Sequence, residues 1–194
     1  MPQVIHRQVS DLREMLSAST VSVILLVVDE AAYQHSGAQE ALEPLLSTVT
    51  VHHWSQFTPN PTLAELENGV AKYQACTPDV VIAIGGGTAL DLGKLISFYG
   101  KQTIPCRELI LSPATNTLDP TPLVAIATTS GTGSETTQFA VIYVDGEKHS
   151  VADPRIRPPQ IVLDPTLTAT MPAALTANTG LDALCQGVES MWSV

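Results

Sequence analysis

Residues 80–94 read VVIAIGGGTALDLGK, and the architecture of the chain can be worked out from this stretch. Its first residues form an apolar run of the length and composition of a buried β-strand, and its later residues have the pattern of a helix. Gly85, Gly86 and Gly87 stand between them and are called the first glycine turn below. Such a turn lets the phosphates of a ligand approach bare backbone N–H groups at a helix N-terminus, where the helix dipole favours negative charge. The stretch therefore predicts an anion-binding turn.

A second turn of the same kind follows about forty residues later. A short apolar strand expected over 123–126 runs into TTSGTGSE at 128–135, which is called the second glycine turn. One such turn is weak evidence for phosphate binding, because many purely structural turns look alike. Two in one chain favour a phosphate-binding site, and Thr128, Thr129 and Thr132 would offer hydroxyl groups beside it.

Strands and helices alternate along the first half of the chain. Repeated strand–helix units imply a Rossmann-like α/β fold, in which a parallel sheet is covered by helices on both faces. The apolar patterns predict strands over 23–28, 49–54 and 80–84, and helices over 9–16, 37–47 (shortened or kinked by Pro44), 63–73 and 92–99.

The second half of the chain has a different pattern. Asp145-Gly146 between the apolar strands expected over 139–144 and 149–151 predicts a β-hairpin, since Asp-Gly is a strong signal for a two-residue turn. Prolines then break up the sequence and leave a short strand over 161–163. A helix is expected from Pro172 to the last residue, Val194, with an interruption near Gly180.

The balance of charges narrows the classes of partner. The chain has 194 residues, with 9 Lys and Arg against 19 Asp and Glu, and a net charge of −10. Nucleic acid and acidic membranes are poor partners for such a surface, so we expect small-molecule ligands. No apolar run is long enough to span a bilayer or to act as an export leader, so we expect a cytoplasmic protein. Cys76, Cys106 and Cys185 are widely spaced and form no CxxC pair, which predicts reduced thiols.

The motifs, in this order and spacing, resemble the iron-containing (group III) alcohol dehydrogenases, which have the dehydroquinate synthase-like fold. The resemblance implies an NAD(P)-dependent oxidoreductase, an alcohol dehydrogenase or aldehyde reductase, usually with a divalent metal such as iron or zinc. The residues that carry it are Asp29, PNPT at 59–62, Thr88, Asp91 and Lys94 after the first glycine turn, TTSGTGSE at 128–135, Asp164-Pro165, GLDAL at 180–184 and Glu189.

The resemblance also implies a division into domains. Residues 1–164 would form the NAD(P)-binding α/β domain, and residues 165–194 the start of a helical domain that carries metal and substrate groups. Family members continue into that helical domain, so we expect this chain to be an N-terminal half that stops at Val194, as an engineered, proteolytic or natural fragment. Apolar surface left exposed in this way predicts self-association into a homo-oligomer.

The resemblance assigns several cofactor contacts. It places the hydroxyls of Thr128, Thr129 and Thr132 around the pyrophosphate and the nicotinamide, and it brings Lys148 to the cofactor. Gly86, Gly87 and Thr88 are expected to bind the cofactor at the first glycine turn. Lysines that flank hairpin turns are more often simply solvated. Asp29, at the end of the first strand, could bind the adenosine ribose and favour NAD over NADP, or it could cap a helix. Asp91 stands three residues after Thr88, so the pair could form a variant capping box or contact the cofactor or substrate.

The resemblance assigns one metal ligand and puts a second in question. Asp182 and Gln186 are four residues apart, so both lie on one face of a helix. The family pattern has a metal-binding Asp at the first position and normally a histidine at the second. A carboxamide is a poorer ligand for iron or zinc than imidazole, although related glycerol dehydrogenases also lack this histidine. The alternative is the polar face of a surface helix, and we expect the isolated chain to hold no stoichiometric metal.

Other functions remain open at this point. A non-redox, dehydroquinate synthase-like lyase is disfavoured by TTSGTGSE, whereas a glycerol dehydrogenase or a non-catalytic dinucleotide-binding or assembly module is compatible with the motifs. No Ser/His/Asp triad and no cysteine nucleophile with a histidine partner is evident, so no catalytic residue is assigned. The ending that contains Gln186, Glu189 and Trp192 resembles members that reduce phosphonoacetaldehyde, which makes that aldehyde a candidate substrate.

Overall fold

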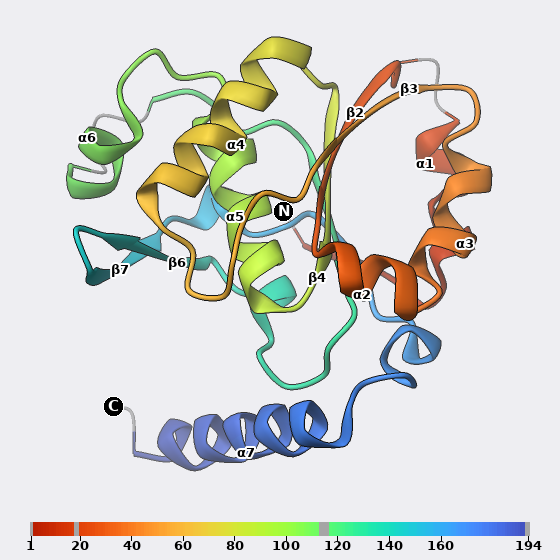
Figure 1. The fold of residues 1–194 in the computed structure, drawn as a ribbon, viewed down its shortest axis with the longest axis vertical. Helices are drawn as coiled ribbons and strands as arrows, with labels where there is room; N and C mark the ends of the chain where they lie inside the picture. Colours follow the sequence, from red (N-terminus) through yellow and green to blue (C-terminus); the bar gives the residue numbers. More distant parts are fainter. Residues whose placement is uncertain (1, 18–19, 113–116, 193–194) are drawn as a thin grey trace.

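The computed structural model of the chain describes residues 2–17, 20–112 and 117–192. A six-stranded, fully parallel sheet with the strand order β1-β8-β5-β4-β2-β3 forms its centre (Figure 1), which confirms the predicted Rossmann-like α/β class. The strands are β1 (Val4–His6), β2 (Val23–Val28), β3 (Thr50–Trp54), β4 (Val80–Gly85), β5 (Leu123–Ala127) and β8 (Gln160–Val162).

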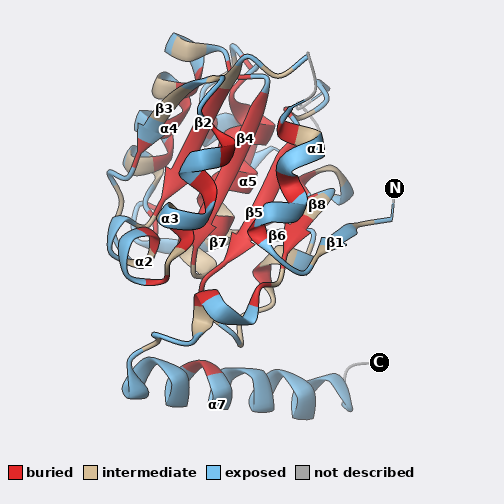
Figure 2. Cartoon of the chain, turned by 90° about the vertical axis from the view of Figure 1, so that its right-hand side faces the viewer, coloured by how far each residue is buried: buried red, intermediate tan, exposed pale blue. Residues whose placement is uncertain are grey.

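Helices cover both faces of this sheet (Figures 1 and 2). Alternate strand residues point to opposite faces, so Leu25 and Val27 join one buried cluster and Ile24 and Leu26 the other. The first cluster includes residues of α4 (Leu63–Cys76), α5 (Gly87–Tyr99) and α6 (Cys106–Leu111), and the second includes residues of α1 (Arg13–Leu16), α2 (Glu30–His35) and α3 (Ala38–Leu42).

The predicted hairpin is confirmed as a separate two-stranded sheet of β6 (Phe139–Val144) and β7 (Glu147–Ala152). Asp145 and Gly146 have φ values of 52° and 84°. Two consecutive positive φ values are the geometry of a type I′ turn, which matches the right-handed twist of the flanking strands.

Several predicted elements differ from those observed. The expected helix over 37–47 divides into α3 and the 3-10 turn η2 (Glu43–Leu45), because Pro44 in that turn cannot continue α-helical hydrogen bonding. The segment 9–16 likewise divides into η1 (Val9–Leu12) and α1. Strand β1 was not predicted, and β8 lies one residue before the expected strand at 161–163.

The last helix, α7 (Ala173–Ser190), runs without a break through Gly180, so the predicted interruption is wrong. It ends at Ser190, and Val194 lies outside the described residues. Figures 1 and 2 show that α7 lies below the sheet and its covering helices, and Thr179 is its one buried residue. A Cβ built on Gly131 would lie 2.3 Å from the Thr179 carbonyl oxygen, so the second glycine turn touches the backbone of α7 at this point.

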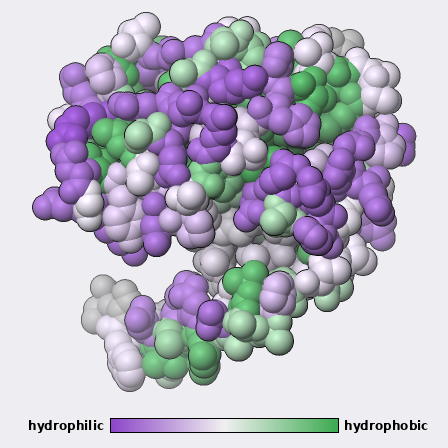
Figure 3. Space-filling model, in the orientation of Figure 1, coloured by the Kyte–Doolittle hydropathy of each residue, from purple (hydrophilic) through white to green (hydrophobic). Residues whose placement is uncertain are grey.

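Much of the apolar surface of α7 is exposed. Leu181 and Leu184 are 60% and 62% exposed, and Figure 3 shows hydrophobic side chains along this helix. Within the described ranges, no helix combines the length and the apolar character needed to cross a bilayer.

Candidate functional site

The strand order places a crevice at the carboxyl ends of β2 and β4. From β2 the chain continues to β3 at one edge of the sheet, and from β4 it continues to β5 in the opposite direction across the sheet. The direction in which successive strands are added therefore reverses between β2 and β4. Ligands of open α/β sheets bind at such a reversal. A cavity of about 520 Å³ lies there and is called the switch-point cavity. Its lining includes Asp29, Ser55, Phe57, Thr58, Pro59, Gly86, Gly87, Thr88, Thr129, Thr132, Leu175 and Thr179.

A larger hollow of about 870 Å³ lies at the other end of α5. It is formed by the last residues of α4 and by residues 100–106, and neither glycine turn reaches it. Its lining includes Pro105 and Cys106 at the start of the six-residue helix α6. The switch-point cavity combines two glycine turns with the N-terminus of the longer helix α5, so it is the better candidate for a phosphate-containing ligand.

The first glycine turn opens α5 into the switch-point cavity. Helix α5 begins at Gly87, and no side chain caps it at Gly86. The N–H groups of a first helical turn have no partners within the helix, so they are available to an anion. Gly85 has a φ of +146°, and a Cβ built there would lie 2.7 Å from the Ala89 Cβ. This turn therefore requires glycine.

The second glycine turn meets the first across the cavity. A Cβ built on Gly86 would lie 3.3 Å from Thr129, and one built on Gly87 would lie 3.5 Å from Thr132. The Thr128 N–H donates to the Gly85 carbonyl at 3.1 Å, which ties the two turns together. The buried Thr128 hydroxyl has no hydrogen-bond partner among the described residues. The glycine backbone between Thr129 and Thr132 leaves space that fits a polar, elongated ligand.

Asp29 follows β2 at the edge of the same cavity. Its carboxylate accepts a hydrogen bond from the Ala32 N–H at 3.1 Å and so caps α2. It also lines the switch-point cavity. The capping role is thus confirmed, and the ribose contact stays a prediction compatible with this position.

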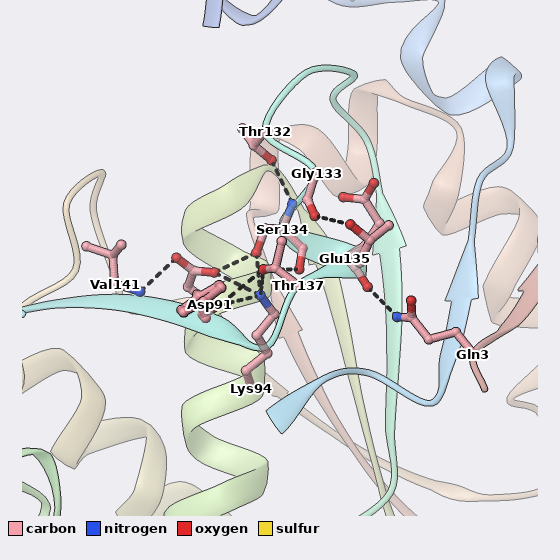
Figure 4. A network of polar contacts seen from close by, with 11 residues as sticks. Gln3, Asp91, Lys94, Thr132, Gly133, Ser134, Glu135, Thr137 and Val141 are labelled. Carbon is pink, nitrogen blue, oxygen red and sulfur yellow. Dashed lines mark hydrogen bonds and ion pairs between the residues drawn. The ribbon is translucent and has the colours of Figure 1, made fainter. Parts of the chain in front are cut away.

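Asp91 has a different environment from the one the sequence suggests. The Thr88–Asp91 capping box is wrong, because Gly86 is the N-cap of α5 and the Asp91 carboxylate is bonded elsewhere. It accepts from the Ser134 hydroxyl at 2.5 Å, the Val141 N–H at 3.0 Å and the Lys94 ammonium at 3.3 Å (Figure 4). Asp91 therefore lies within a polar network beside the cavity.

Sequence reasoning missed the roles of Lys94, Ser134 and Thr137 in this network. Lys94 is fully buried within α5, whose neighbouring residues are almost all buried too. A lysine one turn after an aspartate on an otherwise apolar helix is a signal for a paired, buried charge, and it could have been recognised.

Glu65 was also missed, although it shapes the rim of the cavity. Its carboxylate accepts hydrogen bonds from the N–H and hydroxyl groups of both Thr58 and Thr62. Partial burial would raise the pKa of Glu65, but these donated hydrogen bonds outweigh it and lower this pKa below its ordinary value. The capping box of α4 thereby fixes Thr58 and the neighbouring Pro59 at the cavity.

The remaining predicted residues lie away from the switch-point cavity. Lys148 is exposed on β7 opposite Tyr143 and does not line the cavity. Asp182 and Gln186 are exposed on α7, where the Gln186 amide donates to the Asp182 carboxylate at 3.0 Å. No cluster of three or more His, Cys, Asp or Glu side chains suited to a metal occurs among the described residues. By themselves, these two donors do not fit iron or zinc, which are held by at least three protein ligands.

Comparisons with known proteins agree with this geometry. A sequence model of the family described as "Iron-containing alcohol dehydrogenase" matches residues 3–165. The 1-propanol dehydrogenase PduQ of Citrobacter freundii is 39% identical over 71% of this chain and 34% of its own length. The phosphonoacetaldehyde reductase of Streptomyces viridochromogenes is 36% identical over 80% of this chain and 40% of its own length.

A solved structure gives the same result. The sulfoacetaldehyde reductase of Bifidobacterium kashiwanohense in complex with NAD+ matches 99% of this chain with a TM-score of 0.88 and 25% identity, over 52% of its own chain. The chain thus spans between about a third and about half of the length of these three proteins. Since the family model covers most of its residues, including both glycine turns, the chain belongs to the iron-containing alcohol dehydrogenase family.

Proposed function

We propose that this chain forms the cofactor-binding part of an NAD-dependent alcohol dehydrogenase or aldehyde reductase. The observation that carries the proposal is the meeting of two glycine turns at one cavity, at the uncapped N-terminus of α5. An acidic chain with a net charge of −10 must bind an anionic dinucleotide mainly through such backbone dipoles. The related sulfoacetaldehyde reductase, solved with NAD+, has the same fold.

The cavity residues have separate roles in this proposal. The N–H groups of Gly87 and Thr88 bind the pyrophosphate, and the hydroxyls of Thr129 and Thr132 orient the rest of the dinucleotide. Asp29 binds the adenosine ribose. Bound nicotinamide supplies the chemistry, which is hydride exchange with a small alcohol or aldehyde. Asp182 and Gln186 do not fit a metal alone, so we assign no step to one.

Other parts of the proposal rest on less specific observations. Helix α7 has only Thr179 buried, which supports a separate unit after the α/β domain. Leu167, two residues past the predicted boundary at 165, is buried in the core of the α/β domain. Net negative charge disfavours nucleic acid and acidic membranes as partners, and the exposed leucines of α7 support a homo-oligomer. A cytoplasmic location remains part of the proposal. The match to a phosphonoacetaldehyde reductase makes that aldehyde the first substrate to test.

Calorimetric titration of the purified chain with NAD+ and NADH tests the proposal. We expect saturable binding of one dinucleotide per chain. An assay of NADH oxidation with phosphonoacetaldehyde, and with simple aldehydes, then separates an enzyme from a dinucleotide-binding module without turnover. Failure of both dinucleotides to bind would refute the assignment of the switch-point cavity.

The charge of Asp29 is expected to set the preference for NAD over NADP. Asn caps helices as well as Asp does, so Asp29→Asn keeps the cap on α2 and removes only the charge. The carboxylate repels a 2′-phosphate, so we expect the ratio of the NADP to the NAD dissociation constant to fall roughly tenfold. Asp79→Asn serves as the control, because Asp79 is exposed, precedes β4 at the opposite end of the sheet and likewise accepts hydrogen bonds from backbone N–H groups. Tighter binding of NADP than of NAD by the unmodified chain would refute this role.

The chain is expected to purify without stoichiometric iron or zinc. Asp182 and Gln186 are exposed and hydrogen-bonded to each other, whereas stable sites need more ligands in fixed geometry. Elemental analysis of protein purified without chelators checks this, with Asp182→Asn as the matched variant. About one tightly held metal per chain, lost in Asp182→Asn, would contradict it.

A further inference from the structure

Lys94 is a charged side chain that neither lines the switch-point cavity nor reaches solvent. It is 0% exposed, in a chain that has only 9 Lys and Arg in total. Burying an ammonium group is costly unless it is paired and hydrogen-bonded. Burial lowers the pKa of Lys94 below its ordinary value, and the neighbouring Asp91 carboxylate opposes this shift. Such a residue calls for an explanation beyond filling the core.

Most contacts of the Lys94 ammonium are with the end of the second glycine turn and the residues after it. It donates to the Phe139 carbonyl at 2.7 Å and to the Ser134 hydroxyl at 2.8 Å, and it lies 3.2 Å from the Thr137 hydroxyl. Its ion pair with Asp91 measures 3.3 Å. All its partners except Asp91 belong to the second glycine turn or to the residues that directly follow it (Figure 4).

Asp91 extends the same connection. It accepts from the Ser134 hydroxyl and from the Val141 N–H, so α5 holds both the end of the second glycine turn and the start of β6. Helix α5 also begins with the first glycine turn. The network therefore fixes the far end of one turn to the helix that carries the other.

The spacing of the two turns is what the switch-point cavity depends on. Thr129 and Thr132 approach to within 3.3 and 3.5 Å of the Cβ positions of Gly86 and Gly87. At the near end, the second turn is held by the Thr128 N–H bond to Gly85 and by strand β5. At the far end, the hydrogen bonds of Lys94 and Asp91 hold it. A shift of this end would move the threonine hydroxyls relative to the helix N-terminus.

We propose that Lys94 is a positioning residue, which holds the second glycine turn at the distance from the first that dinucleotide binding requires. It acts through Ser134, Thr137 and the Phe139 carbonyl and does not touch the dinucleotide. Its charge serves the purpose because one ammonium group has three donors, which can satisfy oxygens from several parts of the turn at once. This inference rests on the proposed function, since it assumes that the cavity binds a dinucleotide.

Two variants test the proposal against a control in the same helix. Lys94→Met keeps most of the aliphatic stem and removes the donors, and Ser134→Ala removes one partner and leaves the lysine. Ser97→Ala is the control, because Ser97 is buried one turn along α5 and donates only to the Lys94 carbonyl. Circular dichroism establishes which variants are folded, calorimetry gives the NAD+ dissociation constant, and hydrogen exchange by mass spectrometry follows residues 128–138.

In Lys94→Met we expect the NAD+ dissociation constant to rise roughly tenfold or more, since a hydrogen bond to a charged group is about that strong. Exchange should become faster over 128–138, where the Thr136 and Thr137 amides donate to Gly133 and Ser134, and stay unchanged in β4. Ser134→Ala should show the same changes to a smaller extent, and Ser97→Ala should match the unmodified chain.

A folded Lys94→Met protein that binds NAD+ as tightly as Ser97→Ala, or that leaves exchange over 128–138 unchanged, overturns the proposal. If Lys94→Met does not fold, Ser134→Ala decides by the same two measurements. If the unmodified chain binds no dinucleotide, the proposed function fails. The exchange rates then decide separately whether Lys94 holds the second turn.

Discussion

Replacing Gly86 with valine is expected to weaken NAD+ binding about a hundredfold or more, which corresponds to about 2.7 kcal/mol, while the protein stays folded. The backbone of Gly86 has φ −83° and ψ −169°, an extended conformation that any residue adopts. A Cβ there would already lie 3.3 Å from Thr129, so the branched methyl groups must occupy the space between the two glycine turns. The pyrophosphate then cannot reach the N-terminus of α5.

The matched control for this substitution is Gly187→Val on α7, because a Cβ at Gly187 meets nothing within 4 Å. Both variants are compared by circular dichroism and by calorimetric titration with NAD+. Unchanged affinity in a folded Gly86→Val protein would place the phosphate site elsewhere on the molecule.

Replacing Gly93 with valine is expected to lower the free energy of unfolding by about 3 kcal/mol or more. Gly93 lies where α5 packs on the sheet, and a Cβ there would lie 2.3 Å from the Cβ of Ala83 in β4. Both atoms are fixed to backbone in the buried core, so α5 must move away from β4. Neither residue has a side chain that could rotate away.

Denaturant titration measures this loss, and Gly187→Val again serves as the control. Both sites are helical, so the effect of a β-branched residue on helix propensity is common to them, and the difference reports packing. Equal unfolding free energies for the two variants would mean that the packing of α5 on β4 accommodates a side chain at Gly93, which would contradict the prediction.

Local signals account for most of what the sequence could predict. The first glycine turn, the Asp145-Gly146 hairpin and the alternation of strands and helices depend on residues that are neighbours in the chain, so their geometry follows from local rules. The same holds for Asp29 as a helix cap. These features fix the parallel sheet and the location of the switch-point cavity.

Features that depend on distant contacts were not predictable in the same way. Strand β1 has only three residues and forms because β8, more than a hundred and fifty residues later, offers an edge. Asp91 bonds to Lys94 and, more than forty residues away, to Ser134 and Val141, so the capping box with Thr88, one of two alternatives left open by the sequence, is not formed. Gly180 suggested a break in the last helix, but a single glycine costs only about 1 kcal/mol in a helix and did not interrupt it.

Gly131 contacts α7 at Thr179, the seventh of the eighteen residues of this helix. The helix touches the second glycine turn at this point, and its far end extends eleven residues beyond it, about 16 Å at 1.5 Å per residue. If α7 tilted by about 10° about Thr179, its C-terminal end would move by roughly 3 Å. A displacement of the second glycine turn that tilts α7 would thus be larger at Val188 and Ser190 than at Thr179.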